Sequence, residues 1–209
     1  MESRSGYHKE WFIKRFTYLL NRYPAEFFSG KTILDLGANW GDIHNFFTDL
    51  GAHVTSVEGR QENIDKAKET YPDSDIILYD LDTPKWPWGK FDIIINFGLY
   101  YHLEHFHKEH LQNCLKHCDL MFFETVVYDS FESELYWRTE EGFDQSLTSR
   151  SGTPSTSYVE DILTLERCKF EKISDEALNA PSNHHTYSWE DTGQKVYEQH
   201  SRRMWIITP

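Results

Sequence analysis

The most constraining feature of the sequence is a short apolar run that ends in a glycine-containing turn, ILDLGANWG (residues 33–41). The apolar and β-branched residues of 31–38 predict a strand, and apolar residues at helical spacing follow between 43 and 50. A second strand is predicted at HVTSVEG (53–59). A strand, a helix and a strand in this order form a right-handed crossover between parallel strands. The chain is therefore predicted to have an α/β fold.

The alternation of strands and helices continues to the end of the chain. Further strands are predicted at 75–81, 91–97, 120–129, 168–174 and 204–208, and further helices at 61–71, at about 105–117 and after a capping box formed by Ser157 and Glu160. These elements predict a doubly wound, mostly parallel seven-stranded sheet whose last strand is antiparallel. An apolar stripe in residues 6–28 predicts an extra N-terminal helix ahead of the sheet.

The size and charge of the chain limit its organisation and its partners. A length of 209 residues predicts a single domain (1–209), and an aromatic content of 16% is too high for a disordered protein. The net charge is -13, and the longest basic runs are the pairs Lys14-Arg15 and Arg202-Arg203. Such a surface argues against nucleic acid and anionic membranes as partners, and favours a small acceptor that is neutral or cationic.

Cysteine usage and the absence of targeting signals predict a cytoplasmic protein. The three cysteines (114, 118 and 168) cannot all pair with one another, and a domain of this size needs no disulfide. The N-terminus lacks the apolar segment of a signal peptide, and no stretch approaches the length of a membrane span.

Two segments differ in composition from the predicted core. Residues 130–153 are polar and rich in Ser, Glu and Gly, whereas 179–200 are rich in His and Tyr. Because binding residues are often carried by loops at the ends of strands, both are interpreted as variable segments on the acceptor side of an active site.

The glycine turn and a later carboxylate indicate a nucleotide-like cofactor. Gly37 permits close approach of a ligand to the backbone, and Gly41 opens the following helix. Glu58 ends the next predicted strand, where its carboxylate can accept hydrogen bonds from a ribose diol. A dinucleotide or S-adenosylmethionine would both use these features. Asn39 and Trp40 disfavour a dinucleotide, and with it a nicotinamide dehydrogenase, because a diphosphate requires a bare backbone there.

The order of ILDLGANWG, SVEGR, YDLD and FDIIINFGLYYHL resembles the motifs of class I S-adenosylmethionine-dependent methyltransferases over about residues 31–130. The resemblance implies a Rossmann-like methyltransferase fold with S-adenosylmethionine as cofactor. It places the methionine moiety beside Asp35 and Gly37, ribose on Glu58, adenine near Asp80, and the methyl group near Asn96. The full set of cofactor residues that it implies is Asp35, Gly37, Asn39, Gly41, Glu58, Asp80, Leu81, Asn96 and Phe97. Asp82 is an open alternative to Asp80.

A narrower resemblance is carried by FGLYYHL, FFETVVYD and TPSTSYVEDILTLERCKFEKI, which are similar to the tRNA wobble-uridine carboxymethyltransferase family. The sequence lacks the long N-terminal extension of that family and the basic surface that binds tRNA. A tRNA wobble-uridine modification enzyme is therefore kept as an alternative. A non-catalytic S-adenosylmethionine-binding regulatory module is another.

The candidate catalytic residues follow the fourth and fifth strands of the predicted sheet. His102 can act as a general base near neutral pH, and Tyr101 lies beside it in the sequence. Glu124 is a carboxylate within an apolar strand, which favours a role in orienting the acceptor or a cationic group. Because both His102 and the tyrosines handle protons, methyl transfer to oxygen on a small molecule or a sugar or metabolite moiety is the favoured reaction.

The remaining candidates concern substrate and metal. Candidate substrate-binding residues are Tyr7, Trp11, Tyr100, His185 and Tyr187. The histidines at 102, 105, 107 and 110 have no carboxylate or cysteine at a spacing that completes a tetrahedral site, so a solvated helix face is favoured and no metal is predicted.

Overall fold

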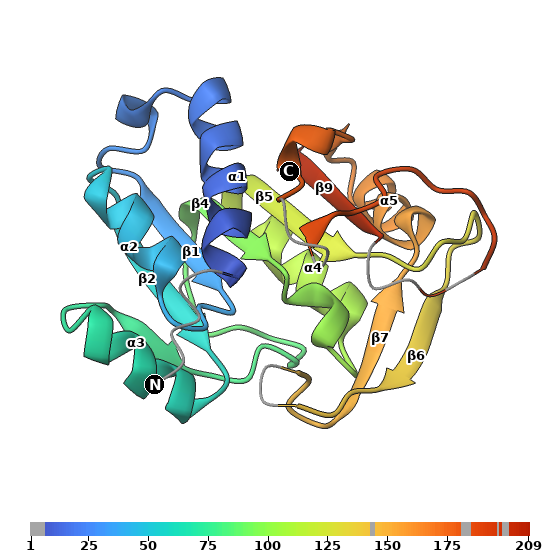
Figure 1. The fold of residues 1–209 in the computed structure, drawn as a ribbon, viewed down its shortest axis with the longest axis horizontal. Helices are drawn as coiled ribbons and strands as arrows, with labels where there is room; N and C mark the ends of the chain where they lie inside the picture. Colours follow the sequence, from blue (N-terminus) through green and yellow to red (C-terminus); the bar gives the residue numbers. More distant parts are fainter. Residues whose placement is uncertain (1–6, 143–144, 181–184, 196, 198–200) are drawn as a thin grey trace.

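The computed structural model describes residues 7–142, 145–180, 185–195, 197 and 201–209, with the backbone alone for 7–9. Its centre is a seven-stranded sheet in the order β3-β2-β1-β4-β5-β9-β8 (Figure 1). The strands are β1 (Thr32–Leu36), β2 (His53–Glu58), β3 (Ile76–Leu78), β4 (Phe91–Phe97), β5 (Cys118–Val126), β8 (Lys169–Ile173) and β9 (Arg202–Thr208). The order reverses between β1 and β4, which is where ligands bind in sheets of this kind.

The directions of the strands confirm the predicted fold class. The pairs β1 with β2, β1 with β4, β2 with β3 and β4 with β5 are parallel. The last strand, β9, runs antiparallel to both of its neighbours, β5 and β8. The structure is therefore a Rossmann-like methyltransferase fold with an N-terminal helix, α1 (Tyr7–Arg22).

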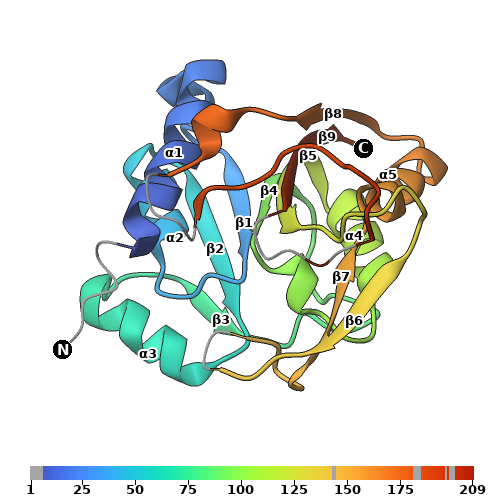
Figure 2. The same cartoon turned by 45° about the vertical axis from the view of Figure 1, so that its right-hand side comes forward.

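Helices cover both faces of the sheet because its strands are apolar on both sides (Figure 2). Ile93 and Ile95 of β4 face one core with α1 and α2 (Asp42–Asp49), whereas Ile94 faces the other. The second core is closed by α4 (His107–Lys116) and α5 (Thr156–Leu165). The helix α3 (Gln61–Thr70) packs through Ile64 and Ala67 against Ile76 of β3. Within the described ranges, no helix is long and apolar enough to cross a membrane.

The polar segment 130–153 contains two strands that its composition does not predict. They are β6 (Leu135–Thr139) and β7 (Arg150–Pro154), and they form a separate antiparallel hairpin. The hairpin extends toward the loops that follow β2 and β3 (Figure 1). Tyr136 and Trp137 remain largely exposed, so the strands lack the apolar alternation by which a sequence reveals them.

Short 3-10 helices complete the chain at Ala25–Phe27, Tyr100–His102 and Glu176–Leu178. The predicted capping box at Ser157 and Glu160 is wrong, because the helix begins two residues earlier. Ser155 is the N-cap residue of α5, and its side chain accepts a hydrogen bond from the backbone N–H of Tyr158.

Candidate functional site

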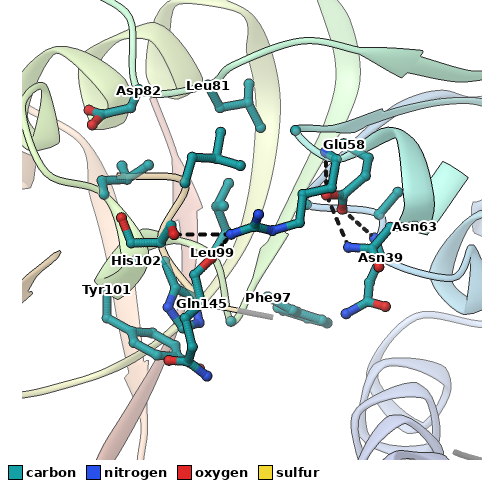
Figure 3. Close-up of a pocket in the computed structure, with 18 of the residues that line it drawn as sticks. Asn39, Glu58, Asn63, Leu81, Asp82, Phe97, Leu99, Tyr101, His102 and Gln145 are labelled. Atoms are coloured by element: carbon teal, nitrogen blue, oxygen red, sulfur yellow. Dashed lines mark hydrogen bonds between the residues drawn. The ribbon is translucent and has the colours of Figure 1, made fainter. Parts of the chain in front are cut away.

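A cavity of about 450 Å³ opens at the carboxyl ends of β1, β2 and β4. It has the size of a small-molecule site. Glu58 and Asn39 lie on one side, Tyr101 and His102 lie on the opposite side, and Phe97 lies between them (Figure 3). The predicted site residues that line it are Trp11, Gly37, Asn39, Glu58, Asp80, Leu81, Phe97, Tyr101, His102, His185 and Tyr187.

The glycine turn after β1 forms part of the cavity floor. Gly37 has a φ of +76°, and a Cβ at this position would lie 3.3 Å from Cβ of Leu99. The N–H groups of Gly37 and Ala38 both donate to the carbonyl of Val57 at 2.9 Å, which ties the turn to the end of β2. A side chain at 37 would be strained and crowded, so the residue keeps the backbone accessible to a ligand.

The carboxylate of Glu58 organises the neighbouring loops. Its Oε2 accepts a hydrogen bond from the backbone N–H of Asn39 at 2.8 Å, and its Oε1 accepts from the backbone N–H of Arg60 at 3.0 Å. The side-chain amide of Asn63 also donates to Oε1, at 3.2 Å (Figure 3). A carboxylate has about four acceptor sites, so Glu58 retains capacity for a ligand hydroxyl.

The two aspartates after β3 differ in what they already bind. The carboxylate of Asp82 accepts hydrogen bonds from the backbone N–H groups of Glu104, His105 and Phe106. Burial raises the pKa of Asp82, but these hydrogen bonds outweigh burial and the net pKa is lowered. Asp80 is exposed beside the cavity, and its carboxylate accepts a hydrogen bond from the backbone N–H of Asp82. The structure therefore gives Asp82 a role in fixing the approach to α4 and leaves Asp80 available.

Two predicted cofactor residues lie beneath the cavity and do not line it. The carboxylate of Asp35 is fully buried and accepts from the hydroxyl of Ser56 at 2.9 Å. Burial raises the pKa of Asp35 to about 7. Asn96 is also fully buried, and its Nδ2 lies 2.9 Å from Nε2 of His110. Alternation along the strand explains this position, because Phe97 faces the cavity and Asn96 faces the opposite core.

Gly41 and Tyr100 also lie outside the cavity lining and connect neighbouring elements of the fold. Gly41 is the N-cap of α2 with a φ of 83°, and a Cβ there would meet Tyr71 at 3.3 Å. Tyr100 is fully buried, and its hydroxyl donates to the carbonyl of His107 at 2.8 Å. Neither residue lines the cavity, because each is used to connect neighbouring elements.

Glu124 is held by two arginines of the chain itself. It is fully buried, and Nε and NH2 of Arg15 donate to its two oxygens at 2.8 and 2.9 Å. Arg202 donates to Oε1 at 3.0 Å. Burial alone would raise the pKa of Glu124, but the two guanidinium groups lower it. The cationic groups that Glu124 contacts are the protein's own Arg15 and Arg202, and Glu124 does not line the cavity.

His102 lines the cavity and is paired with a carboxylate from the β6–β7 hairpin. Its Nδ1 lies 2.7 Å from Oε2 of Glu140, a side chain with 0% exposure. Burial lowers the pKa of His102 below its usual value, although Glu140 acts in the opposite direction. Neutral His102 donates its Nδ1–H to the carboxylate, so its lone pair is on Nε2.

The hairpin tip closes one side of the cavity. NH2 of Arg60 donates to the carbonyls of Gln145 and Ser146 at 2.8 and 3.0 Å (Figure 3). A Cβ on Gly59 would lie 2.8 Å from Cδ1 of Leu147, which shows how closely this loop approaches β2. The polar composition of 130–153 indicated a variable segment on the acceptor side of an active site, but it did not identify Glu140 or these contacts.

The acceptor-side candidates come together from distant segments. Trp11, His185 and Tyr187 all line the cavity, and Nδ1 of His185 lies 2.6 Å from the Tyr187 hydroxyl. Burial raises the pKa of Tyr187 to about 12. The side chain of Tyr7 and, within the segment 179–200, residues 181–184, 196 and 198–200 lie outside the described residues.

The histidines after β4 are engaged separately. His105 contacts Asp82 at 3.1 Å, and Nε2 of His107 lies 2.7 Å from the carbonyl of Gly152. Nδ1 of His110 lies 3.2 Å from the carbonyl of Leu81. In the described part of the chain, no group of three metal-ligating side chains comes together.

Comparison with known proteins gives one matching family and several solved structures of similar fold. The family described as a methyltransferase domain matches residues 8–159. No curated protein sequence matches the chain. The N-terminal domain of EvdMO1, solved in the presence of SAH and D-fucose, has a TM-score of 0.68 at 15% identity, with 100% of this chain and 88% of that chain covered.

Two further solved structures share the fold. An S-adenosylmethionine-dependent methyltransferase from Mesorhizobium loti has a TM-score of 0.64 at 14% identity, covering 94% of this chain and 98% of that chain. Coclaurine N-methyltransferase bound to N-methylheliamine and SAH has a TM-score of 0.59 at 17% identity, covering 85% of this chain and 55% of that chain.

Proposed function

The chain belongs to the methyltransferase domain family, an S-adenosylmethionine-dependent group of enzymes, and we propose that it methylates a hydroxyl group of a small molecule or of a sugar or metabolite moiety. The observation that carries this proposal is the pair of His102 and Glu140 at a cavity that also contains Gly37 and Glu58. A neutral histidine held by a carboxylate is suited to remove a proton, which a hydroxyl acceptor requires.

The residues around the cavity fit S-adenosylmethionine. The left-handed conformation of Gly37 and the crowding that any Cβ would meet there leave a bare backbone surface beside the methionine moiety. Glu58 would accept hydrogen bonds from the ribose hydroxyls, and Asp80 and Leu81 would lie beside adenine. Phe97 would lie below the sulfur. The positions of Asp35, Asn96 and Gly41 support this arrangement from underneath without contact to the cavity.

The chain's own residues would handle the proton of the reaction. When bound, S-adenosylmethionine supplies a methyl group on a positively charged sulfur, which leaves as a neutral thioether. Nε2 of His102 accepts the hydroxyl proton as the oxygen–carbon bond forms. Glu140 holds Nδ1–H and stabilises the charge that develops on the ring. Tyr101, whose ring lies 3.9 Å from that of His102, would position the acceptor.

The enclosure of the acceptor side supports a small acceptor. Trp11, Tyr101 and Tyr187 line this end of the cavity, and all three residues come from different parts of the chain. The solved structures of similar fold include one with D-fucose and one with N-methylheliamine. Both are small molecules, and their presence with proteins of similar fold supports a small acceptor for this chain.

The direct test is a panel of acceptors with radiolabelled S-adenosylmethionine. Hydroxyl compounds, including sugars, should be methylated. Any methylation of the matching amines should not require His102. The proposal fails if the protein binds S-adenosylhomocysteine in calorimetry but transfers label to no hydroxyl compound. That result would favour transfer to nitrogen or carbon, or a regulatory module that binds the cofactor without turnover.

A tRNA wobble-uridine acceptor is the alternative from the narrower sequence resemblance. It is supported by the adjacency of Tyr101 and His102 after β4. Salt-sensitive binding of tRNA in a filter assay at low salt would support it, and no retention at low salt would eliminate it.

A further inference from the structure

The cavity carries opposite charges at its two ends. The carboxylates that line it are Glu58, the last residue of β2, and Asp80 and Asp82, which follow β3. Toward β5 and β9, the lining residues are aromatic or apolar apart from histidines and Arg202. Among the described lining residues, Arg202 is therefore the one permanently charged side chain at this end. The other lining arginine, Arg60, belongs to the β2 end and binds the carbonyls of the hairpin tip.

Among the residues that the structure describes, Arg202 has no carboxylate of its own to balance its charge. Its ion-pair partner, Glu124, is already bound through both oxygens by Arg15, and the Arg15 and Glu124 side chains have 0% exposure. One carboxylate thus faces two guanidinium groups, which leaves a net charge of +1. Arg138 and Glu140 form a neighbouring ion pair whose charges cancel, so the net charge of +1 is unchanged. An uncompensated buried cation is costly unless a ligand anion joins it.

The guanidinium of Arg202 retains unused donors. NH1 donates to Glu124 at 3.0 Å, and NH2 contacts the Tyr101 hydroxyl at 3.4 Å. Nε has no hydrogen-bond partner within the described ranges. The side chain is only 10% exposed, and it lines the cavity. Five N–H groups with so few acceptors match a carboxylate, which a guanidinium can bind through two parallel hydrogen bonds.

Aromatic rings surround this cation. Cζ of Arg202 lies 4.8 Å from the ring centroid of Tyr187, and 5.5 Å from those of both Tyr101 and Trp11. Such rings exclude water and strengthen the interaction of the guanidinium with an anion. They also provide apolar walls for the body of a flat molecule.

Arg202 lies far from the β2 and β3 end of the cavity, where the adenosine part of the cofactor is proposed to bind. In the sheet, β9 is four strands from β2, which corresponds to about 19 Å at the usual spacing. NH1 of Arg202 lies near Gly98, where an added Cβ would be 3.8 Å away. The guanidinium therefore lies just past the end of β4, beyond Phe97 on the acceptor side.

From this geometry we propose that Arg202 binds a carboxylate of the acceptor, so that the substrate is a small organic acid with a flat apolar body. This inference rests on the proposed function and names its substrate class. An organic acid differs from the neutral or cationic acceptor that the net charge of -13 favours. Net charge averages the whole surface, whereas Arg202 is a local excess of positive charge within one cavity.

Calorimetry with benzoate as the probe tests this proposal on the full chain saturated with S-adenosylhomocysteine. Benzoate should bind at least about tenfold more tightly than benzamide, which has the same shape without the charge. Arg202→Gln should remove this preference, and Arg202→Lys should retain part of it. The control variant Arg22→Gln changes an exposed arginine that does not line the cavity and should leave benzoate affinity unchanged. Equal affinities for benzoate and benzamide, or an unchanged preference in Arg202→Gln, would overturn the proposal.

A second measurement separates the acceptor from the cofactor's own carboxylate. S-adenosylhomocysteine carries a methionine-type carboxylate, and 5′-methylthioadenosine lacks it. Arg202→Gln should bind both with wild-type affinity, which also shows that the variant is folded. If the variant loses affinity only for S-adenosylhomocysteine, Arg202 binds the cofactor and the proposal is wrong. Failure of the wild-type protein to bind S-adenosylhomocysteine would instead contradict the proposed function.

Discussion

Nδ1 of His102 lies 2.7 Å from Oε2 of Glu140, which joins the end of β4 to the β6–β7 hairpin across 38 residues of sequence. The hairpin therefore supplies one member of the proposed catalytic pair and also borders the cavity. Removing His102 should be more damaging than removing the group that orients it.

His102→Ala is expected to lower kcat for a hydroxyl acceptor by about 100-fold or more. Glu140→Gln should lower kcat less, and should also move the acidic limb of the pH profile to lower pH. The reason is that burial lowers the pKa of His102 and Glu140 opposes this effect, so loss of the carboxylate lowers that pKa further. Steady-state rates from pH 5 to 8 measure both effects. The exposed neighbour Glu141→Gln is the matched control and should behave as wild type.

Glu58→Gln should weaken binding of S-adenosylhomocysteine by about 10-fold or more, measured by calorimetry. A carboxamide keeps the size of the side chain, but its NH2 group cannot accept hydrogen bonds from ribose hydroxyls. Glu62→Gln, on the exposed first turn of α3, is the control. Unchanged affinity in Glu58→Gln would show that Glu58 only supports the loops around Asn39 and Arg60.

Asp35→Asn should change the pH dependence of stability in the protein without cofactor. Burial raises the pKa of Asp35 from 3.8 to about 7, so the folded state binds a proton that the unfolded state has released. The contribution of this proton to the stability of the folded state is fully present below pH 3.8, and it is lost as the pH rises through about 7. In urea unfolding, the free energy of unfolding of Asp35→Asn should rise by up to about 4 kcal/mol relative to that of the wild type between pH 4 and pH 8.

The exposed control Asp73→Asn should keep the wild-type pH dependence in the same experiment. A wild-type pH profile in Asp35→Asn would mean that Asp35 is ionised in the folded protein at neutral pH.

Glu124→Gln is expected to destabilise the fold by about 3 to 5 kcal/mol, because it leaves Arg15 and Arg202 without their buried counter-ion. Urea denaturation measures this loss. The control is Glu171→Gln, which removes an exposed ion pair with Arg22 and should cost at most about 1 kcal/mol. A Glu124→Gln protein with wild-type stability and reduced turnover would return Glu124 to a direct catalytic role.

The strands and helices of the central sheet were predictable because each has a local sequence pattern. The run FDIIINF predicts β4 as a central strand, and the glycine turn at 37 predicts the crossover beside β1. The hairpin of β6 and β7 was not predictable, because its strands are short and present tryptophan and tyrosine to solvent. Its role depends on contacts with Arg60 and His102 that no local pattern encodes.

The sequence by itself determined the α/β order, the bare backbone at Gly37 and the carboxylate of Glu58 at the end of β2, since strand periodicity and turn chemistry are local properties. The tertiary structure decided which polar side chains face the cavity. Glu124 meets Arg15 across 109 residues and Arg202 across 78, so it became a buried ion-pair partner and left Arg202 as the charged group at the acceptor end. Electrostatic balance depends on distances between atoms, and those distances exist only once the chain has folded.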